Sequence, residues 1–347
     1  MVGGGTAGHV IPALPVMQQL LTQDCRLTFV GTHSGLEQRL VADLPVAFVG
    51  IQAGKLRRYW SWQNLTDVAR ILVGVLQALW LLLRDRPQVV FSKGGFVSFP
   101  VAFAAWLLRI PVVAHESDLS PGLANRMVLP FVRCLCTSFA ATTVARKAVK
   151  VVHVGTPIRP ELLQGDAAAG RQSLQVPTTA PLLVVTGGSL GADHLNAVVR
   201  QSLAELTQSY FVFHVCGAGK LSGLQQANYQ EVEYVGQGWG DILAAADIVL
   251  SRAGANALFE LLALGKRNLL VPLSAKASRG DQIENAQFAQ DQGYSVVIDE
   301  DEFDTASLLV GLRELEDKAE EFSATLSHFE VPPAAAKLTQ EILQAAI

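Results

Sequence analysis

Charged side chains are scarce in this chain of 347 residues. Lys, Arg, Asp and Glu together make up 17% of it, whereas 50% of the residues are apolar. The mean hydropathy of +0.30 excludes an intrinsically disordered chain. It is also high for a freely soluble enzyme, so we expect some apolar surface to face something other than water. The net charge of −4 lacks the basic excess of nucleic-acid-binding proteins, and we expect no nucleic acid partner.

Cysteine is also scarce, with 4 residues in the whole chain. Their positions show neither a paired metal-ligand spacing nor the density of a disulfide-stapled secreted scaffold. We therefore expect reduced, mostly buried thiols at Cys25, Cys134, Cys136 and Cys216. Cys134 and Cys136 fit one face of a buried strand. The acidic run Asp299 to Asp301 is turn-like and has no further ligand cluster nearby, so the sequence predicts no bound metal.

The sequence lacks a secretory signal and a membrane-spanning segment. No basic segment followed by an apolar run opens the chain, and we expect a protein of the cytoplasm. The longest uncharged apolar run, Ile71 to Leu83, is shorter than the roughly 20 residues that span a bilayer. It is flanked by Arg70 and Arg84 and follows a basic and aromatic segment, Lys55 to Trp62. Such a helix suits either an anionic membrane surface, on which it would lie without crossing, or the core of the protein.

Apolar runs rich in β-branched residues alternate with helical patterns along the chain. Val89 to Phe91, Ile110 to Val113 and Leu182 to Thr186 are almost continuously apolar, which is typical of parallel strands covered by helices on both faces. The sequence therefore predicts an α/β fold. A chain of 347 residues exceeds what one hydrophobic core usually organises, so we expect two domains.

The two halves of the chain share a plan of motifs. The stretch Val90 to Gly95, followed by an apolar helix and a strand, matches Val249 to Gly254 with the same succession after it. The glycine-rich turn Gly3 to Gly8 likewise resembles Thr186 to Gly191. Two Rossmann-like domains that face each other across a cleft explain this repeat. Chance similarity among turn glycines is the alternative.

A hinge is predicted where two prolines follow a short strand, in the segment Gly155 to Pro160. This boundary divides the chain into a first Rossmann-like domain, residues 1–156, and a second one, residues 157–330. Residues 331–347 begin at a proline pair and fit a final helix, which we expect to pack back on the first domain.

Glycine-rich turns after strands are candidate phosphate sites. Gly187 to Gly191, between a strand and a helix, would let the backbone approach a phosphate, because its amides and the helix dipole attract the anion. Ser189 would add a hydroxyl donor. Gly3 to Gly8 has the same form. Tight packing of the turn would by itself also require glycine at these positions.

Polar side chains at the ends of strands and loops are further candidates. Glu260, about two turns into a helix after a glycine-rich turn, can accept hydrogen bonds from both hydroxyls of a ribose or lie in solvent. Asp281, at a helix start, binds a ligand or caps the helix. Glu116 and Asp118 follow a buried strand, at the edge where open α/β sheets place their sites. His9 follows the first glycine turn at a predicted helix start, where an imidazole could move protons.

Taken in order, these motifs resemble the MurG family of bacterial UDP-N-acetylglucosamine transferases. The match runs almost from end to end and is carried by Gly4 to His9, Phe91 to Ser98, His115 to Asn125, Gly187 to Gly191 and Ser251 to Gly254. The resemblance implies a GT-B fold, inversion at the anomeric carbon, and an enzyme that needs no metal or other cofactor. It also implies a peripheral protein at the cytoplasmic face of the cell membrane that serves peptidoglycan biosynthesis, and hence cell shape and cell division.

The reaction implied by the resemblance moves N-acetylglucosamine from UDP-N-acetylglucosamine to the C4 hydroxyl of the muramoyl sugar of lipid I. Lipid I is undecaprenyl-pyrophosphoryl-muramoyl-pentapeptide, and the product is lipid II. By motif position, Arg159 and Ser189 would hold the diphosphate of the donor and Glu260 its ribose. Gln282 would bind the hydroxyls of the sugar, and the backbone near Val235 would bind uracil. The reaction centre would be lined from the first domain by Thr6, Ala7 and Gly8.

The same reaction requires a base that takes the proton from the attacking hydroxyl. Three residues qualify by position: His9, Glu116 and Asp118. We favour His9, because an imidazole is partly unprotonated at neutral pH and a helix N-terminus would disfavour its charged form. The alternative is that His9 only positions the donor diphosphate or the acceptor.

The chain departs from the family pattern at three places. It has Asp281 before Gln282 where members often carry two glutamines, and Asp118 in place of an asparagine. Only Met1 and Val2 precede the first glycine turn, where the family has a strand, so we expect the first domain to lack a central strand. Two other functions stay open: a related glycolipid synthase that acts on diacylglycerol, and a partner subunit that binds UDP-N-acetylglucosamine without transferring it.

Overall fold

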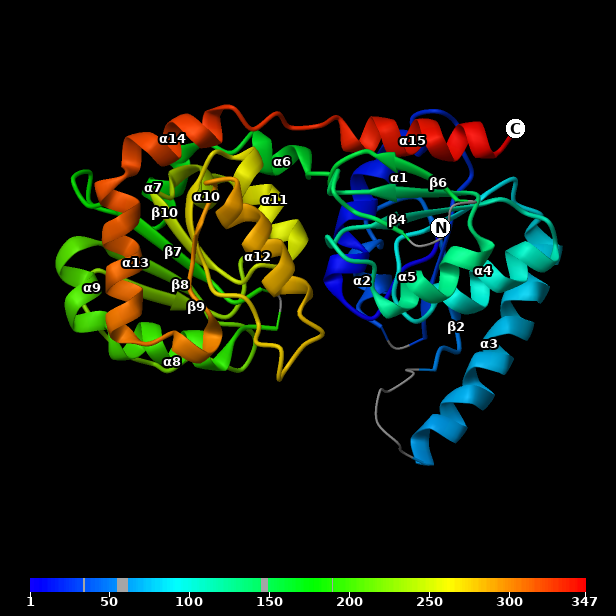
Figure 1. The fold of residues 1–347 in the computed structure, drawn as a ribbon, viewed down its shortest axis with the longest axis horizontal. Helices are drawn as coiled ribbons and strands as arrows, with labels where there is room; N and C mark the ends of the chain where they lie inside the picture. Colours follow the sequence, from blue (N-terminus) through cyan, green and yellow to red (C-terminus); the bar gives the residue numbers. More distant parts are fainter. Residues whose placement is uncertain (34, 55–61, 145–148, 189) are drawn as a thin grey trace. The chain divides into compact units, whose positions relative to one another are not determined.

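The computed structural model describes residues 1–33, 35–54, 62–144, 149–188 and 190–347. It divides the chain into two compact units, one made of Met1–Pro157 and Pro332–Ile347 and the other of Ile158–Val331. Each unit has parallel strands with helices packed against them (Figure 1). The prediction of a two-domain α/β fold is confirmed.

The first unit is built on parallel strands whose central members are buried throughout. A four-stranded sheet has the order β3-β4-β5-β6, and β1 pairs with β2 in a two-stranded sheet. Burial on both faces explains why β3, β4 and β5 are almost continuously apolar. The strands are β1 (Thr28–Thr32), β2 (Ala47–Ile51), β3 (Val90–Ser92), β4 (Val112–Glu116), β5 (Cys134–Thr137) and β6 (Lys150–His153).

The chain start joins these two sheets. The amide of Val2 donates to the carbonyl of Phe91 at 2.8 Å, and the amide of Val30 donates to the carbonyl of Met1 at 2.8 Å. Val2 thereby forms isolated parallel bridges with both Val30 and Ser92, and its side chain is buried. The described chain has no regular strand at this position, in line with the prediction, although Val2 pairs with both neighbouring strands.

Helices cover both faces of the first unit. On one face α3 packs on α4, and on the other α1 packs on the C-terminal helix α15. The packing of α15 places residues after Pro332 in the first unit. The helices are α1 (Leu14–Leu21), α2 (Glu37–Leu40), α3 (Trp62–Asp85), α4 (Ser98–Leu107), α5 (Leu123–Val128) and α15 (Ala334–Ala345).

The second unit contains one parallel sheet in the order β12-β11-β10-β7-β8-β9. Its central strands β7, β8 and β10 carry buried residues that divide between two core clusters, one on each face. The strands are β7 (Leu182–Thr186), β8 (Phe211–Val215), β9 (Tyr229–Val232), β10 (Ile248–Ser251), β11 (Arg267–Leu270) and β12 (Val296–Val297).

The second unit has helices between its strands, and further helices before its first strand and after its last one (Figure 1). The helices are α6 (Pro160–Leu163), α7 (Ala167–Ser173), α8 (Asp193–Gln201), α9 (Leu203–Ser209), α10 (Trp239–Ala245), α11 (Ala255–Ala263), α12 (Asp281–Asp291), α13 (Thr305–Asp317) and α14 (Ala319–Ser327).

The strand order reverses direction once in each unit. In the second unit the reversal lies between β7 and β10, so the loops that leave their carboxyl ends diverge. In the first unit it lies between the Val2 segment and β3. Open α/β sheets bind ligands in the crevice outside the carboxyl ends of strands at such a point. The topology therefore places the glycine-rich turns at the two positions where a site is expected.

Candidate active site

The glycine turn of the second unit connects β7 to α8. Gly188 has φ of 81° and Gly191 has φ of 67°, a backbone region that favours glycine. A Cβ atom on Gly187 would lie 2.5 Å from the amide nitrogen of Ala192, whereas one on Gly188 would meet nothing within 4 Å. The turn is therefore tightly packed on one side and open at Gly188. Ser189, predicted to bind the diphosphate, lies outside the described residues.

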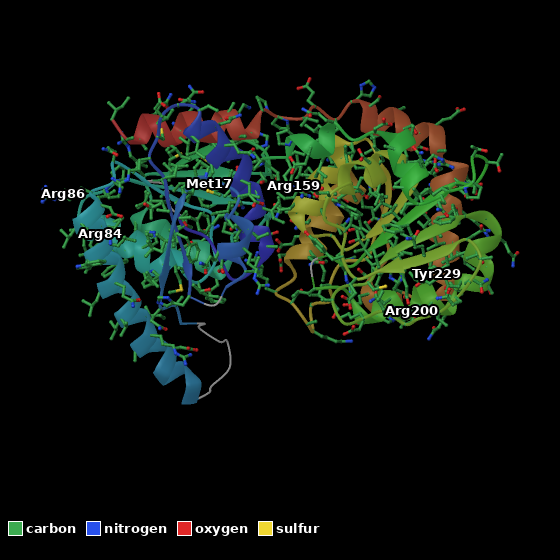
Figure 2. All side chains as sticks on the ribbon, turned by 180° about the vertical axis from the view of Figure 1, so that it is seen from behind. Met17, Arg84, Arg86, Arg159, Arg200 and Tyr229 are labelled. Carbon is green, nitrogen blue, oxygen red and sulfur yellow. The ribbon has the colours of Figure 1, made fainter. Side chains whose placement is uncertain are left out.

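Two predicted donor ligands lie against each other in the second unit. Arg159 precedes α6 and Glu260 lies within α11, and Nη2 of the arginine is 3.5 Å from Oε1 of the glutamate. Burial raises the pKa of Glu260, while the guanidinium of Arg159 acts in the opposite direction. Nε of Arg159 is buried and has no hydrogen-bond partner among the described residues. The arginine (labelled in Figure 2) thus has a buried donor that no described residue satisfies.

Gln282 lies in the first turn of α12, and its side-chain oxygen accepts a hydrogen bond from the amide of Leu273 at 3.0 Å. This contact fixes the side chain while its NH₂ group keeps two donors. The residue before it, Asp281, does not cap the helix: the N-cap is Gly280, and Asp281 pairs with Arg279 at 3.2 Å. The capping interpretation of Asp281 is therefore wrong.

Val235 lies in the segment between β9 and α10. Its side chain packs against a core cluster of the second unit, whereas the preceding Tyr234 is 70% exposed. The packing of the Val235 side chain against this cluster thus fixes the backbone at this position.

In the first unit, the turn Gly3 to Gly8 is held by a residue that the sequence did not single out. The amide of Gly5, which has φ of 90°, donates to Oε1 of Glu37 at 2.8 Å. Glu37 is fully buried and lies 32 residues away in the sequence. A Cβ atom on Gly95 would lie 2.0 Å from the carbonyl oxygen of Gly4, so the glycine turns after the first segment and after β3 are in backbone contact.

His9 ends a short 3-10 helix that contains Ala7 and Gly8. Its Nδ1 atom lies 3.0 Å from Oγ1 of Thr6, and its ring lies over Gly94, where a Cβ atom would be 3.2 Å from Cδ2 of the imidazole. The first α-helix begins only at Leu14. The prediction that His9 sits at a helix N-terminus is wrong, and the orientation of its ring comes from Thr6 and the second glycine turn.

Glu116 ends β4 and is buried. Its carboxylate accepts hydrogen bonds from the amide of Asp118 at 3.0 Å, the amide of Gly122 at 2.9 Å and Nδ2 of Asn125 at 2.8 Å. Two of these donors lie in the loop after β4 and the third lies in α5, so the carboxylate is satisfied by structural contacts. Glu116 therefore shapes the loop that carries Asp118, whose side chain is partly exposed.

Lys93 is a functional candidate that sequence reasoning missed. It follows β3, is 2% exposed, and its Nζ donates to Oγ of Ser117 at 2.6 Å. Burial lowers the pKa of Lys93 to about 8, while Glu116 and Asp118 act in the opposite direction. The signal available in the sequence was a lysine at the carboxyl end of an apolar strand, directly before two glycines.

The acidic run Asp299 to Asp301 has structural partners. Glu300 pairs with the buried Arg252, and its other oxygen accepts the amide of Ser274 at 2.8 Å. Asp301 pairs with Lys276 at 2.8 Å. Glu300 thus links the loop after β10 to the loop after β11.

Comparison with known proteins decides the family. The N-terminal domain of glycosyltransferase family 28 matches residues 1–137, and the C-terminal domain of that family matches residues 182–338. The chain belongs to glycosyltransferase family 28. Its relatives place it in the MurG group: a Legionella pneumophila (strain Lens) protein is 42% identical over 99% of this chain and 96% of its own length. A Clostridium kluyveri protein is 44% identical over 91% of this chain and 90% of its own.

Both family 28 relatives are named UDP-N-acetylglucosamine--N-acetylmuramyl-(pentapeptide) pyrophosphoryl-undecaprenol N-acetylglucosamine transferase. Among solved structures, Acinetobacter baumannii MurG superimposes with a TM-score of 0.78 at 26% identity, covering 99% of this chain and 98% of that one. The predicted GT-B class is confirmed by this likeness, and the chain is a glycosyltransferase.

Helix α3 of this family 28 member carries an exposed apolar face. Leu72, Leu76, Trp80 and Leu83 are 61%, 66%, 63% and 56% exposed, whereas Val75, Ala78, Leu81 and Leu82 are buried. The interpretation of this helix as a plain core helix is therefore wrong. No described helix is both long and apolar enough to cross a membrane.

Proposed function

We propose that this chain transfers N-acetylglucosamine from UDP-N-acetylglucosamine to the C4 hydroxyl of the muramoyl sugar of undecaprenyl-pyrophosphoryl-muramoyl-pentapeptide, with inversion, forming lipid II for peptidoglycan. The observation that carries the proposal is a likeness of 42% identity along 99% of the chain to transferases named for this donor and acceptor. The paired Arg159 and Glu260 in the second unit agree with a nucleotide-sugar site.

The second unit would hold the donor. Its diphosphate would lie on the turn Gly187 to Gly191, where Ser189, Arg159 and the backbone amides stabilise the charge that develops as UDP leaves. Because these groups neutralise the leaving group, the reaction needs no metal in principle. Glu260 would accept the ribose hydroxyls, which displace its pairing with Arg159 and free the guanidinium for the diphosphate.

The remaining donor contacts would be specific for the sugar and the base. The NH₂ group of Gln282 would bind hydroxyls of N-acetylglucosamine, since its oxygen is already engaged by Leu273. The backbone near Val235 would bind uracil.

The first unit would act on the acceptor. Thr6, Ala7 and Gly8 would line the reaction centre, and His9 would take the proton of the C4 hydroxyl. In this role Nδ1–H of His9 donates to Oγ1 of Thr6, and Nε2 accepts the proton. Of the two carboxylates that could replace it, Asp118 is the better placed, because Glu116 is occupied by three donors.

The exposed face of α3 would dock on the cytoplasmic face of the cell membrane. Its apolar side chains would enter the lipid, and the flanking cations Arg70 and Arg84 would meet anionic headgroups. The guanidinium of Arg84 lies 4.8 Å from the ring centre of Trp80, so cation and apolar face are adjacent (Arg84 in Figure 2). The basic segment Lys55 to Trp62 lies outside the described residues apart from its last member.

A transfer assay tests the proposal. Radiolabelled UDP-N-acetylglucosamine is incubated with the protein and either a short-chain lipid I analogue or diacylglycerol. We expect label only in the lipid I product. Label in diacylglycerol would make the chain a glycolipid synthase, and donor binding without transfer to either acceptor would make it a binding subunit.

A further inference from the structure

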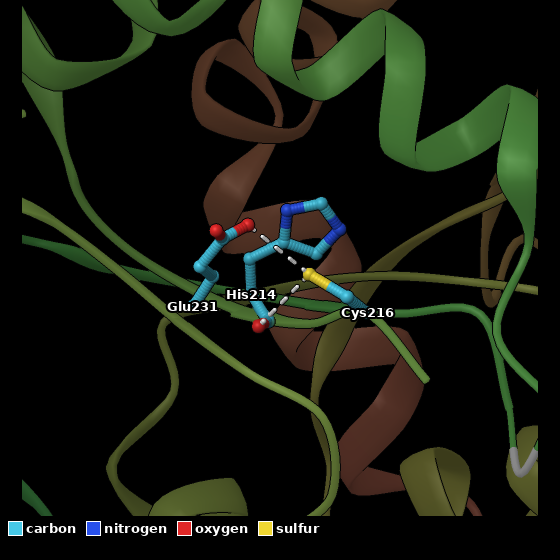
Figure 3. A group of neighbouring side chains, drawn as sticks. All are labelled: His214, Cys216 and Glu231. Atoms are coloured by element: carbon cyan, nitrogen blue, oxygen red, sulfur yellow. Dashed lines mark hydrogen bonds between the residues drawn. The ribbon is translucent and has the colours of Figure 1, made fainter. Parts of the chain in front are cut away.

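A chain of buried polar side chains crosses the second unit beneath the glycine turn that follows β7. It runs from α8, which carries Asn196 and Arg200, through His214 on β8 to Tyr229 and Glu231 on β9. Figure 3 shows His214 and Glu231 beside Cys216, and Figure 2 places Arg200 and Tyr229 in the second unit. Asn196, His214 and Tyr229 are 2%, 0% and 9% exposed. Buried polar groups of this kind are costly unless every one is hydrogen-bonded.

The hydrogens of the inner half of this network can be assigned from its acceptors. Nδ2 of Asn196 donates to the carbonyl of Cys216 at 2.9 Å, which orients the amide. The amide oxygen lies 2.9 Å from Nε2 of His214, and because an amide oxygen only accepts, Nε2 carries a hydrogen. Burial lowers the pKa of His214 to about 4, so the ring is neutral at pH 7. Its Nδ1 then carries no hydrogen and lies 3.1 Å from the Tyr229 hydroxyl, whose single hydrogen is shared between this nitrogen and the carboxylate of Glu231.

Glu231 closes the outer half. One carboxylate oxygen lies 3.0 Å from the Tyr229 hydroxyl and 3.0 Å from Nη2 of Arg200. The other accepts the amides of Ser222 and Gly223, each at 2.7 Å. Burial alone would raise the pKa of Glu231, but these hydrogen bonds lower it to about 2. A permanently ionised carboxylate therefore ties the loop after β8 to the network.

This arrangement is a hydrogen-bond network rather than a metal site. His214, Cys216 and Glu231 offer ligand atoms within 4.8 Å of one another, but both nitrogens of His214 and both oxygens of Glu231 already have partners. Arg200 lies among them, with Nη2 3.3 Å from Sγ of Cys216, so a cation is already present. Burial raises the pKa of Cys216 to about 11, which keeps it a thiol.

The network touches the glycine turn through its backbone. A Cβ atom on Gly191 would lie 2.0 Å from the carbonyl oxygen of Cys216, and one on Gly217 would lie 2.7 Å from Cα of Gly191. The Cys216–Gly217 backbone is therefore the surface on which the turn rests. The same Cys216 carbonyl is the one that Asn196 holds.

We propose that the network from Asn196 through His214 and Tyr229 to Glu231 is a positioning device for the nucleotide diphosphate. It fixes the Cys216 carbonyl, and through it the backbone of the turn, in which the amide of Gly188 donates to Oγ1 of Thr186 at 3.3 Å and the amide of Gly191 donates to the carbonyl of Gly188 at 3.0 Å. This inference rests on the proposed function, in which that turn binds the donor diphosphate. Asn196, His214 and Tyr229 are buried, so their proposed effect is on the geometry of the turn, where small displacements are costly.

Tyr229→Phe tests the inference, because it removes one hydroxyl and leaves the ring. The matched control is Ser295→Ala, which removes a buried hydroxyl that donates to Asn268 at 2.6 Å, at the amino end of β11 in the same unit. Three quantities are measured for both variants: the unfolding midpoint, hydrogen exchange at the amides of Gly188 and Gly191 without ligand, and the Kd for UDP by calorimetry.

We expect both variants to lower the unfolding midpoint by similar amounts. Only Tyr229→Phe should also speed hydrogen exchange in the turn and raise the Kd for UDP. Each of these two changes should be about 10-fold, which corresponds to the loss of one buried hydrogen bond. A turn exchange rate and UDP Kd equal to those of Ser295→Ala would overturn the inference. A wild-type protein that does not bind UDP would instead overturn the proposed function, and the exchange comparison would still decide the positioning role.

Discussion

Nη2 of Arg159 lies 3.5 Å from Oε1 of Glu260, with the two side chains 23% and 16% exposed. The pair joins the segment that opens the second unit to the helix after β10. Each side chain has a competing partner in the proposed complex, the diphosphate for Arg159 and the ribose for Glu260. Ligand binding would therefore exchange one internal ion pair for two contacts to the nucleotide.

Glu260→Ala should raise the KM for UDP-N-acetylglucosamine. A lost hydrogen bond to a charged group costs about 1.5 to 3 kcal/mol, which corresponds to roughly 10- to 100-fold in affinity. Steady-state kinetics with varied donor measure the effect. Glu314→Ala is the control, because that carboxylate lies on the surface of α13 and pairs with Lys318. A donor KM within two-fold of the control variant would remove Glu260 from the site.

Gln282→Ala should weaken binding of UDP-N-acetylglucosamine while leaving the Kd for UDP unchanged, since its NH₂ group is proposed to bind the sugar. We expect about a 10-fold rise in donor KM for one lost hydrogen bond. Gln287→Ala is the matched control, because this side chain lies on the same helix and donates to Asp291. Equal losses of affinity for UDP and for UDP-N-acetylglucosamine would show that Gln282 stabilises the helix and does not bind the sugar.

Lys93 should make stability depend on pH. The folded state binds this proton less tightly than the unfolded chain, because the pKa falls from 10.5 to about 8. The cost of burying the cation is therefore fully present below pH 8 and is relieved as the pH rises toward 10.5. Relative to Lys93→Met, the free energy of unfolding of the wild type should rise by on the order of 3 kcal/mol across this pH window. Urea unfolding of both proteins at about pH 7 and about pH 10 measures this difference in the free energy of unfolding. If that free energy changes with pH by the same amount in the two proteins, the prediction is wrong.

The fold could be predicted from the sequence more completely than the site. Continuous apolar runs identify strands such as β7, and glycine turns mark where they end, because both are local patterns. Glu37 and Lys93 could not be assigned, since their roles arise from contacts to Gly5 and Ser117 that are distant in sequence. A glycine turn usually opens a helix, so the sequence predicts a helix start at His9, yet here only a short 3-10 helix follows.

The apolar face of α3 predicts membrane binding that depends on Leu76 and Trp80. Replacing both with glutamate removes apolar burial worth about 1.5 to 3 kcal/mol for each fully buried side chain and adds charge of the wrong sign for anionic lipid. Sedimentation with anionic vesicles should fall by at least about 10-fold. Val310→Glu, at a 61% exposed apolar residue of the second unit, is the control. If both proteins sediment alike, α3 does not face the membrane.

His9 is the proposed base, and its loss should act on the chemical step. Removing a general base lowers the rate by about 10²- to 10⁴-fold, so His9→Ala should reduce kcat by that factor while the Kd for UDP, measured by calorimetry, stays near the wild-type value. His328→Ala, which removes an exposed histidine of the second unit, should change neither. Thr6→Val should give a smaller loss in kcat, because it removes the hydroxyl that lies 3.0 Å from Nδ1 and orients the ring.

If kcat instead survives within a few-fold in His9→Ala and is abolished in Asp118→Ala, the base is the carboxylate of Asp118. Glu116→Ala tests the third candidate. Because the Glu116 carboxylate accepts three hydrogen bonds, its removal should lower the unfolding midpoint together with the activity.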